Sequence, residues 1–254
     1  MKRETVLITG ASSGIGREMA KQLSHKGYDL IIVARREERL RELASELKTN
    51  CRVIVADLTE LDACYSLYEE TKNENITMLI NNAGFGLVDD FVSASLEKEL
   101  EMIRINIQTL DVLSNLFLQD FVRKDYGSIL NVSSIAGLMP GGPYMASYYA
   151  TKAYVTSLSL GINQELREAN SQVYIGALSP GPVSTEFDDV AGSSFSLKSI
   201  TAQECAMYGI SQMFKKKTII IPGTTLKMAA ILAKVAPRKL VVKIAGYQQM
   251  KKRG

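Results

Sequence analysis

The chain has 254 residues, of which 46% are hydrophobic and 22% are charged, with a formal net charge of +3. This composition excludes a disordered or membrane-spanning chain, and the length suits one large α/β domain. The single histidine, His25, argues against a Ser-His-Asp hydrolase and a multi-histidine metal centre, while three scattered cysteines indicate a cytoplasmic protein with reduced thiols and no metal site.

Short apolar runs alternate with helical patterns along the chain. The runs are nearly continuous in Val, Ile and Leu, which is typical of parallel strands covered on both faces. We expect seven strands, at residues 5–9, 29–34, 52–56, 78–81, 128–133, 173–179 and 218–221. The helical segments are 14–26, 37–48, 60–72, 97–122 and 145–168. This alternation predicts a three-layer α/β/α fold with a doubly wound parallel sheet of the Rossmann type, formed by residues 1–225.

A glycine-rich turn follows the first predicted strand, and it reads Thr-Gly-Ala-Ser-Ser-Gly-Ile-Gly over residues 9–16. Glycines permit a tight turn and a close approach of the backbone to a phosphate, which then meets the positive end of the next helix. The spacing differs from the usual dinucleotide fingerprint, so a purely structural turn is the alternative. The residues that we expect at a cofactor are Gly10, Ser12, Ser13, Gly14, Ile15 and Gly16.

The second predicted strand is followed directly by Arg35 and Arg36, with no carboxylate before Glu37. An acidic side chain at this place binds the ribose 2′-hydroxyl of NAD(H), whereas arginine accommodates the 2′-phosphate of NADP(H). We therefore expect NADP(H), with Arg35 as the stronger phosphate ligand. NAD(H) stays open, because two arginines also suit the start of a solvated helix.

Tyr148 and Lys152 lie four residues apart in a predicted helix and therefore on one face of it. A phenol with a pKa of about 10 is a poor proton shuttle near neutrality, and a nearby ammonium lowers that pKa. Tyr149 is out of register with this cation, because its own partner at i+4 is Ala153. Ser134 follows the fifth predicted strand, at the sheet edge of the glycine turn, where its hydroxyl binds either a substrate oxygen or strand-end backbone groups.

Together these residues resemble the short-chain dehydrogenase/reductase family, over about residues 4–225. The resemblance also rests on Asp57, Asn81-Asn82-Ala83-Gly84, Asn106, Pro180-Gly181 and Thr185. It implies that Tyr148 protonates a carbonyl oxygen as hydride arrives from the nicotinamide. It further implies that Lys152 lowers the tyrosine pKa and binds the nicotinamide ribose, that Ser134 polarises the carbonyl, and that Asn106 holds a water for proton relay. The other implied cofactor contacts are Asp57, Leu58, Asn82, Ala83, Gly84, Pro180, Gly181, Val183 and Thr185.

One position departs from the family pattern. NADP-preferring members often carry a basic residue immediately before the middle glycine of the turn, where this chain has Ser13. Arg17 lies beyond the turn and cannot be assumed to replace it. The prediction of NADP(H) therefore rests mainly on Arg35 and Arg36.

The resemblance implies an NADPH-dependent oxidoreductase that reduces a carbonyl to an alcohol or catalyses the reverse. A dinucleotide-binding regulatory protein without turnover is the alternative. We expect an apolar substrate, such as a steroid, fatty acyl or lipid ketone, against Leu138, Met139, Phe187 and Phe195. The family's mode of association implies a homodimer or homotetramer through the helices at 97–122 and 145–168.

Residues 226–254 are predicted to form a basic, amphipathic helical extension, broken at Pro237. Eleven Lys or Arg and no Asp or Glu occur from Cys205 onward, whereas the rest of the chain is net acidic. Three alternatives stay open: packing on the core or another subunit, contact with an anionic membrane surface, or attraction of an acidic acyl carrier. Nucleic-acid binding is not expected, since no recognisable motif is present. The apolar positions are Met228, Ile231, Leu232, Val235, Leu240, Ile244 and Tyr247.

Overall fold

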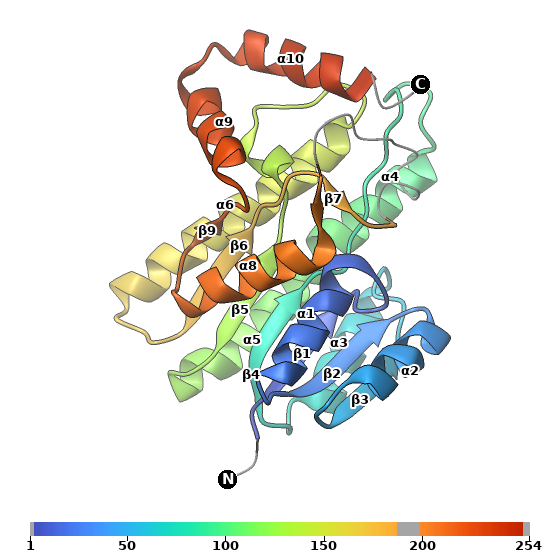
Figure 1. Cartoon of the computed structure of the whole chain (residues 1–254), viewed down its shortest axis with the longest axis vertical. Coiled ribbons are helices and arrows are strands. Elements are labelled where there is room, and N and C mark those ends of the chain that lie inside the picture. The colour runs from blue at the N-terminus through green and yellow to red at the C-terminus, as the bar shows by residue number, and fades with distance from the viewer. Residues whose placement is uncertain (1–2, 187–198, 251–254) are drawn as a thin grey trace.

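The computed structural model describes residues 3–186 and 199–250, and its centre is a seven-stranded parallel sheet (Figure 1). The strand order is β3-β2-β1-β4-β5-β6-β9. The strands are β1 (Thr5–Thr9), β2 (Asp29–Ala34), β3 (Cys51–Val55), β4 (Ile76–Asn81), β5 (Ser128–Val132), β6 (Tyr174–Leu178) and β9 (Ile219–Ile220). All seven predicted strands are present, so the predicted Rossmann-type sheet is confirmed.

Helices cover both faces of the sheet. One face carries α1 (Gly14–His25), α2 (Glu37–Glu46) and α8 (Ala202–Phe214), and the other carries α3 (Leu61–Thr71), α5 (Leu110–Lys124) and α6 (Ala146–Glu168). Successive side chains of a strand point to opposite faces. Along β1, Val6 and Ile8 therefore join the cluster that includes α1, whereas Leu7 joins the cluster that includes α5.

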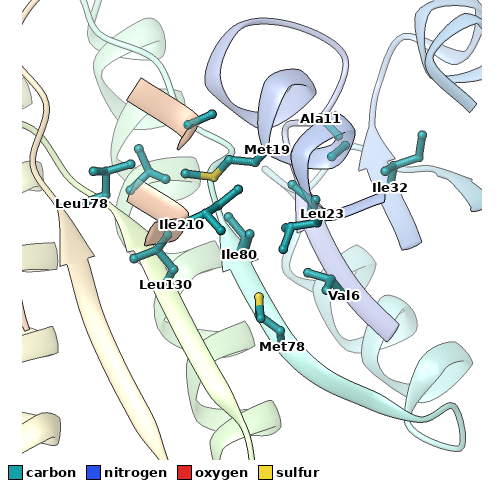
Figure 2. Packing of buried hydrophobic residues seen from close by; sticks show 14 of the residues in the cluster. Val6, Ala11, Met19, Leu23, Ile32, Met78, Ile80, Leu130, Leu178 and Ile210 are labelled. Carbon is teal, nitrogen blue, oxygen red and sulfur yellow. The ribbon is translucent and has the colours of Figure 1, made fainter. Parts of the chain in front are cut away.

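The cluster beneath α1 and α8 shows how the two helices meet the sheet (Figure 2). Met19 and Leu23 of α1 point toward the strands, with Met19 beside Ile210 of α8, and all three are buried. The helix α8 was not among the predicted elements, and neither were the short paired strands β7 (Val183–Ser184) and β8 (Ile200–Thr201). A capping box between Thr201 and Glu204 begins α8.

The predicted helix at 97–122 is interrupted. It consists of α4 (Leu96–Ile103), a π-helical turn η1 (Arg104–Thr109) and then α5. A helical pattern in the sequence does not distinguish a π turn from an α turn, because both leave the apolar stripe on one side. Such turns occur frequently at functional sites, and this one contains Asn106.

The C-terminal segment forms two helices, α9 (Thr224–Val235) and α10 (Arg238–Met250), with the predicted break at Pro237. Figure 1 places them at the end of the molecule opposite the N-terminus. Leu226 of α9 lies against Gly181, and Gly246 of α10 lies against Pro143. Among the described residues, no helix is long and apolar enough to cross a membrane.

Phe117 is the aromatic centre of the core beneath α5. Its ring is 2% exposed and meets Tyr68 edge to face, with 5.3 Å between the ring centroids. We expect Phe117→Ala to lower the free energy of unfolding by about 3–5 kcal/mol in urea titrations, because it leaves a cavity. Phe91→Ala is the matched control, since Phe91 is 68% exposed and should change stability by less than about 0.5 kcal/mol. Equal losses would contradict this account of the core.

Candidate active site

A cavity of about 600 Å³ opens at the carboxyl ends of the strands. The strand order reverses between β1 and β4, and ligands of open α/β sheets bind at such a point. The predicted residues that line the cavity are Gly10, Ser12, Ser13, Gly14, Ile15, Arg35, Arg36, Asp57, Leu58, Asn82, Ala83, Gly84, Ser134, Tyr148, Lys152, Pro180, Gly181, Val183 and Thr185. Two predicted site residues, Gly16 and Asn106, do not line it and are buried behind its wall.

The glycine turn has no room for side chains where it meets the segment after β4. Gly10 has a φ of 66°, and a Cβ there would lie 2.8 Å from the Ala83 Cα. A Cβ on Gly16 would lie 2.4 Å from the Asn82 Nδ2. The Asn82 amide donates hydrogen bonds to the carbonyls of Thr9 (3.1 Å) and Gly10 (2.9 Å). Gly16 thus supports the turn from behind, and Gly10 and Gly14 form the cradle that faces the cavity.

Arg36 is the arginine that contacts the glycine turn. Its guanidinium donates to the hydroxyls of Ser12 (3.1 Å) and Ser13 (2.9 Å), and it pairs with Glu186 at 2.8 Å. Arg39, one turn later on α2, also pairs with Glu186. These two arginines lower the pKa of the Glu186 carboxyl to about 2. Two cations therefore converge on one carboxylate at the end of β2, and one of them, Arg36, also binds two hydroxyls of the glycine turn.

Arg35 has a different environment from its neighbour. Its guanidinium lies 3.3 Å from the Glu101 carboxylate and 3.8 Å from that of Asp57. Arg17 also turns away from the cavity and pairs with Glu42 at 3.0 Å. The geometry thus favours Arg36 over Arg35, which had the greater weight in the sequence analysis, as the group for an anion at the turn.

Tyr148, Ser134 and Lys152 meet at the other end of the cavity. Tyr148 and Lys152 lie on α6, and Ser134 caps the short 3-10 turn at Ile135–Leu138. The Ser134 hydroxyl donates to the Pro180 carbonyl at 3.5 Å and accepts a hydrogen bond from the Ala136 N–H at 3.2 Å. It also lies close enough to the Tyr148 phenol to lower the pKa of that phenol by hydrogen bonding. The Lys152 Nζ donates to the Val132 carbonyl at 2.9 Å and lies 5.8 Å from the centroid of the Tyr148 ring.

Burial decides the protonation of this pair. It raises the pKa of Tyr148 to about 12, and the hydrogen bond with Ser134 opposes part of that rise. It lowers the pKa of Lys152 to about 8. We expected the ammonium to lower the tyrosine pKa, but burial of the phenol raises that pKa instead. At neutral pH Tyr148 therefore carries its proton, as a general acid must.

Asn106 fixes the backbone beside Lys152. Its side chain accepts a hydrogen bond from the Phe85 N–H (3.1 Å) and donates to the Phe85 carbonyl (2.9 Å) and the Thr151 hydroxyl (3.0 Å). Gly84 lies between the two, since a Cβ there would be 2.5 Å from the Asn106 Oδ1 and 3.6 Å from the Lys152 Nζ. Asn106 thereby anchors the segment that follows β4 against α6.

An apolar wall encloses the space around Tyr148. Phe85, Leu87, Met145 and Tyr149 line it. Leu138 and Met139, which were predicted as pocket walls, do not line this cavity but a separate hollow against α9. Met139 nevertheless packs against the apolar cluster that includes Tyr148. Phe187 and Phe195 lie outside the described residues.

Several residues at the site were not predicted from the sequence. Gln248 and Gln249 of α10 line the cavity, and the Gln249 amide donates to the Tyr149 hydroxyl at 2.8 Å. Arg39 and Glu186 were also missed. Arg39 follows Arg36 by one helical turn, so a search for clustered arginines would have found it. Glu186 and α10 are far along the chain from the other site residues, and no local sequence pattern points to them.

A glycine cradle at one end and a buried Ser-Tyr-Lys group at the other define a Rossmann-type oxidoreductase. Comparison with known proteins gives the family: the short chain dehydrogenase model matches residues 4–194, and the chain belongs to this family of oxidoreductases that act on alcohol and carbonyl groups. The family predicted from the sequence is confirmed.

Individual relatives are similar over most of their length. The chain is 35% identical to a probable NADP-dependent dehydrogenase of Haemophilus influenzae, over 75% of this chain and 76% of that one. A short-chain dehydrogenase from Sphingobium yanoikuyae in complex with NADPH has a TM-score of 0.82 and 31% identity, covering 91% and 93%. A bulky-bulky ketone specific alcohol dehydrogenase from Comamonas testosteroni has a TM-score of 0.78 and 28% identity, covering 91% of each chain.

Proposed function

We propose that this protein is an NADPH-dependent carbonyl reductase with Tyr148 as the proton donor. The observation that carries the proposal is that the buried side chains of Ser134, Tyr148 and Lys152 line the same cavity as the glycine cradle. When bound, the cofactor supplies the hydride. The cradle fits such a group, because it leaves backbone at Gly10 and Gly14 open to a phosphate near the start of α1.

Each polar side chain then has a separate task. The hydroxyls of Ser134 and Tyr148 donate hydrogen bonds to the substrate carbonyl oxygen, and Tyr148 gives up its proton as negative charge develops there. Lys152, as a cation, stabilises the phenolate that remains and binds the nicotinamide ribose. Asn106 fixes the positions of Lys152 and Gly84 and thereby maintains the geometry of the proton relay.

The preference for NADPH rests on Arg36 in this proposal. Arg36, Arg39, Ser12 and Ser13 supply the donors that a 2′-phosphate requires, and Glu186 marks where an anion is stable. Asp57 and Leu58 then flank the adenine, with Arg35 beside them. The NADPH complex of the Sphingobium yanoikuyae relative supports this choice.

We propose a bulky apolar ketone as the substrate. The side chains around Tyr148 that do not belong to the catalytic group are mainly apolar, from Phe85, Leu87 and Met145. The Comamonas testosteroni relative, described as specific for bulky-bulky ketones, supports the same substrate class. A mainly apolar wall gives no reason to select a small, charged carbonyl compound.

The direct test is consumption of NADPH and NADH by the purified protein against short ketones, steroids, long-chain ketones and 3-oxoacyl thioesters. We expect turnover with NADPH on the bulky apolar members and little on short ketones. Turnover with NADH at equal efficiency would contradict the role of Arg36. Cofactor binding without turnover on any member would favour the regulatory alternative.

The pKa of Lys152 predicts the pH profile of reduction. Lys152, with its pKa lowered to about 8, loses its positive charge as the pH rises through that value, while Tyr148 stays protonated to about pH 12. We expect kcat/KM for reduction to be level below about pH 7 and to fall above pH 8, by about tenfold per unit. The measurement is kcat/KM from pH 6 to 10 at constant ionic strength. A rate that rises toward pH 9 would contradict a cationic lysine.

We also propose that two copies associate through α5 and α6. These helices leave Val122, Tyr154 and Leu160 exposed on the surface. Light scattering coupled to gel filtration measures the mass, and Leu160→Asp should lower it to that of one chain. A mass that is unchanged by this substitution would contradict the interface.

A further inference from the structure

The two C-terminal helices pack through one face and expose apolar side chains on the opposite one. On α9, Leu226 meets Gly181 and Ala230 is buried. The positions half a turn away are exposed, with Val235 at 79%. They are Met228, Ile231, Leu232 and Val235.

The helix α10 repeats this arrangement. Ala245, Gly246 and Gln249 are buried, and Gln249 holds the helix to Tyr149. The exposed apolar positions recur at helical spacing on the other side, and they are Leu240, Ile244, Tyr247 and Met250. A surface helix ordinarily turns its apolar stripe toward the core. Both helices do the reverse, so each exposes an apolar stripe of the kind that marks a surface for a partner.

The charges beside these stripes identify the kind of partner. Lys234, Arg238, Lys239 and Lys243 are exposed, and none of them forms an ion pair within residues 3–186 and 199–250. No Asp or Glu occurs after Glu204. A second copy that docked through the same face would bring like charges together, whereas an anionic surface complements them.

We propose that α9 and α10 bind the surface of an anionic lipid bilayer. The exposed apolar stripes enter the boundary between headgroups and acyl chains, and the flanking lysines contact the anionic headgroups. This proposal goes beyond the proposed enzymatic function. The lipid contact itself does not depend on that function, whereas its consequence for the substrate does.

The position of α10 gives this contact a consequence for the site. Gln248 and Gln249 line the cavity that holds Tyr148, while Ile244 on the same helix is exposed to the outside. Bilayer docking of α10 therefore brings the apolar wall of the cavity close to the lipid phase, where an apolar ketone dissolves.

The test is co-sedimentation of the full chain with vesicles of equal parts phosphatidylglycerol and phosphatidylcholine, compared with vesicles of phosphatidylcholine alone. We expect strong pelleting with the anionic vesicles, weak pelleting with the neutral ones, and release at high salt. The double variant Ile231→Ser, Ile244→Ser removes two exposed apolar side chains from the stripes. The double variant Lys239→Gln, Lys243→Gln removes two of the flanking positive charges. Each pair should lower the partition coefficient by about tenfold or more.

Matched controls carry the same substitutions elsewhere on the surface. Leu61→Ser with Val92→Ser removes exposed apolar side chains, and Lys26→Gln with Lys124→Gln removes exposed charge. Both should pellet like the unchanged chain. Circular dichroism and NADPH binding confirm that every variant is folded.

Four results would overturn the proposal. One is the absence of pelleting by the full chain, and another is equal pelleting of the α9 and α10 variants and their controls. The third combines two measurements: the full chain does not bind vesicles, and the Ile231→Ser, Ile244→Ser variant has a lower mass by light scattering than the full chain. That result would make this face an interface between copies. Capture of an acidic acyl carrier protein without vesicle binding would equally reject the bilayer.

Discussion

Tyr148→Phe should lower kcat for carbonyl reduction by about 10³-fold. The substitution removes only the hydroxyl, which hydrogen bonds with Ser134 and holds the proton that a carbonyl oxygen needs. The ring stays in place beneath Lys152, so the dissociation constant for NADPH should change by less than about twofold. Single-turnover kinetics and NADPH fluorescence measure the two quantities separately.

Tyr149→Phe is the matched control, because it removes the neighbouring hydroxyl from the same helix. The Tyr149 hydroxyl accepts its hydrogen bond from Gln249 and not from the Ser134 group. We expect its kcat to stay within about threefold of that of the unchanged protein. Equal losses in both variants would show that the phenol at 148 is not the proton donor.

Arg36→Ala should weaken NADPH binding by about 10- to 100-fold and leave NADH binding unchanged. The guanidinium donates to Ser12 and Ser13 and is one of two cations on Glu186, so its loss removes charge-assisted hydrogen bonds from the phosphate position. Equilibrium titration of both cofactors gives the ratio of dissociation constants. Arg35→Ala is the matched control, since that side chain lies against Glu101 and Asp57.

Glu186→Gln completes this comparison. The Glu186 carboxylate pairs with Arg36 and Arg39, where the 2′-phosphate is proposed to bind, so it competes with that phosphate. Removing its charge should tighten NADPH binding several-fold and leave NADH binding the same. If Arg35→Ala weakened NADPH binding and Arg36→Ala did not, the sequence-based preference for Arg35 would be restored.

Local sequence patterns determined the sheet, the glycine turn and the register of Tyr148 with Lys152. Each depends on residues a few positions apart: the continuous Val, Ile and Leu runs, three glycines after the first strand, and a spacing of four on one helix. The parallel fold then brings the carboxyl ends of the strands to one edge, which is why Ser134 could be expected near the turn. The order of motifs along the chain was also enough to identify the family.

The tertiary structure alone decided features that depend on distant residues. Arg36 and Glu186 are 150 residues apart in the chain, and Tyr149 and Gln249 are 100 apart, so no periodicity connects them. The π turn that contains Asn106 could not be predicted, because the hydrophobic pattern of the sequence there is the same as that of an α-helix. An amphipathic pattern likewise cannot show which way a helix faces. The packing of Leu226 against Gly181 and of Gly246 against Pro143 fixes which side of α9 and α10 faces the protein, and it leaves the apolar stripes on the outside.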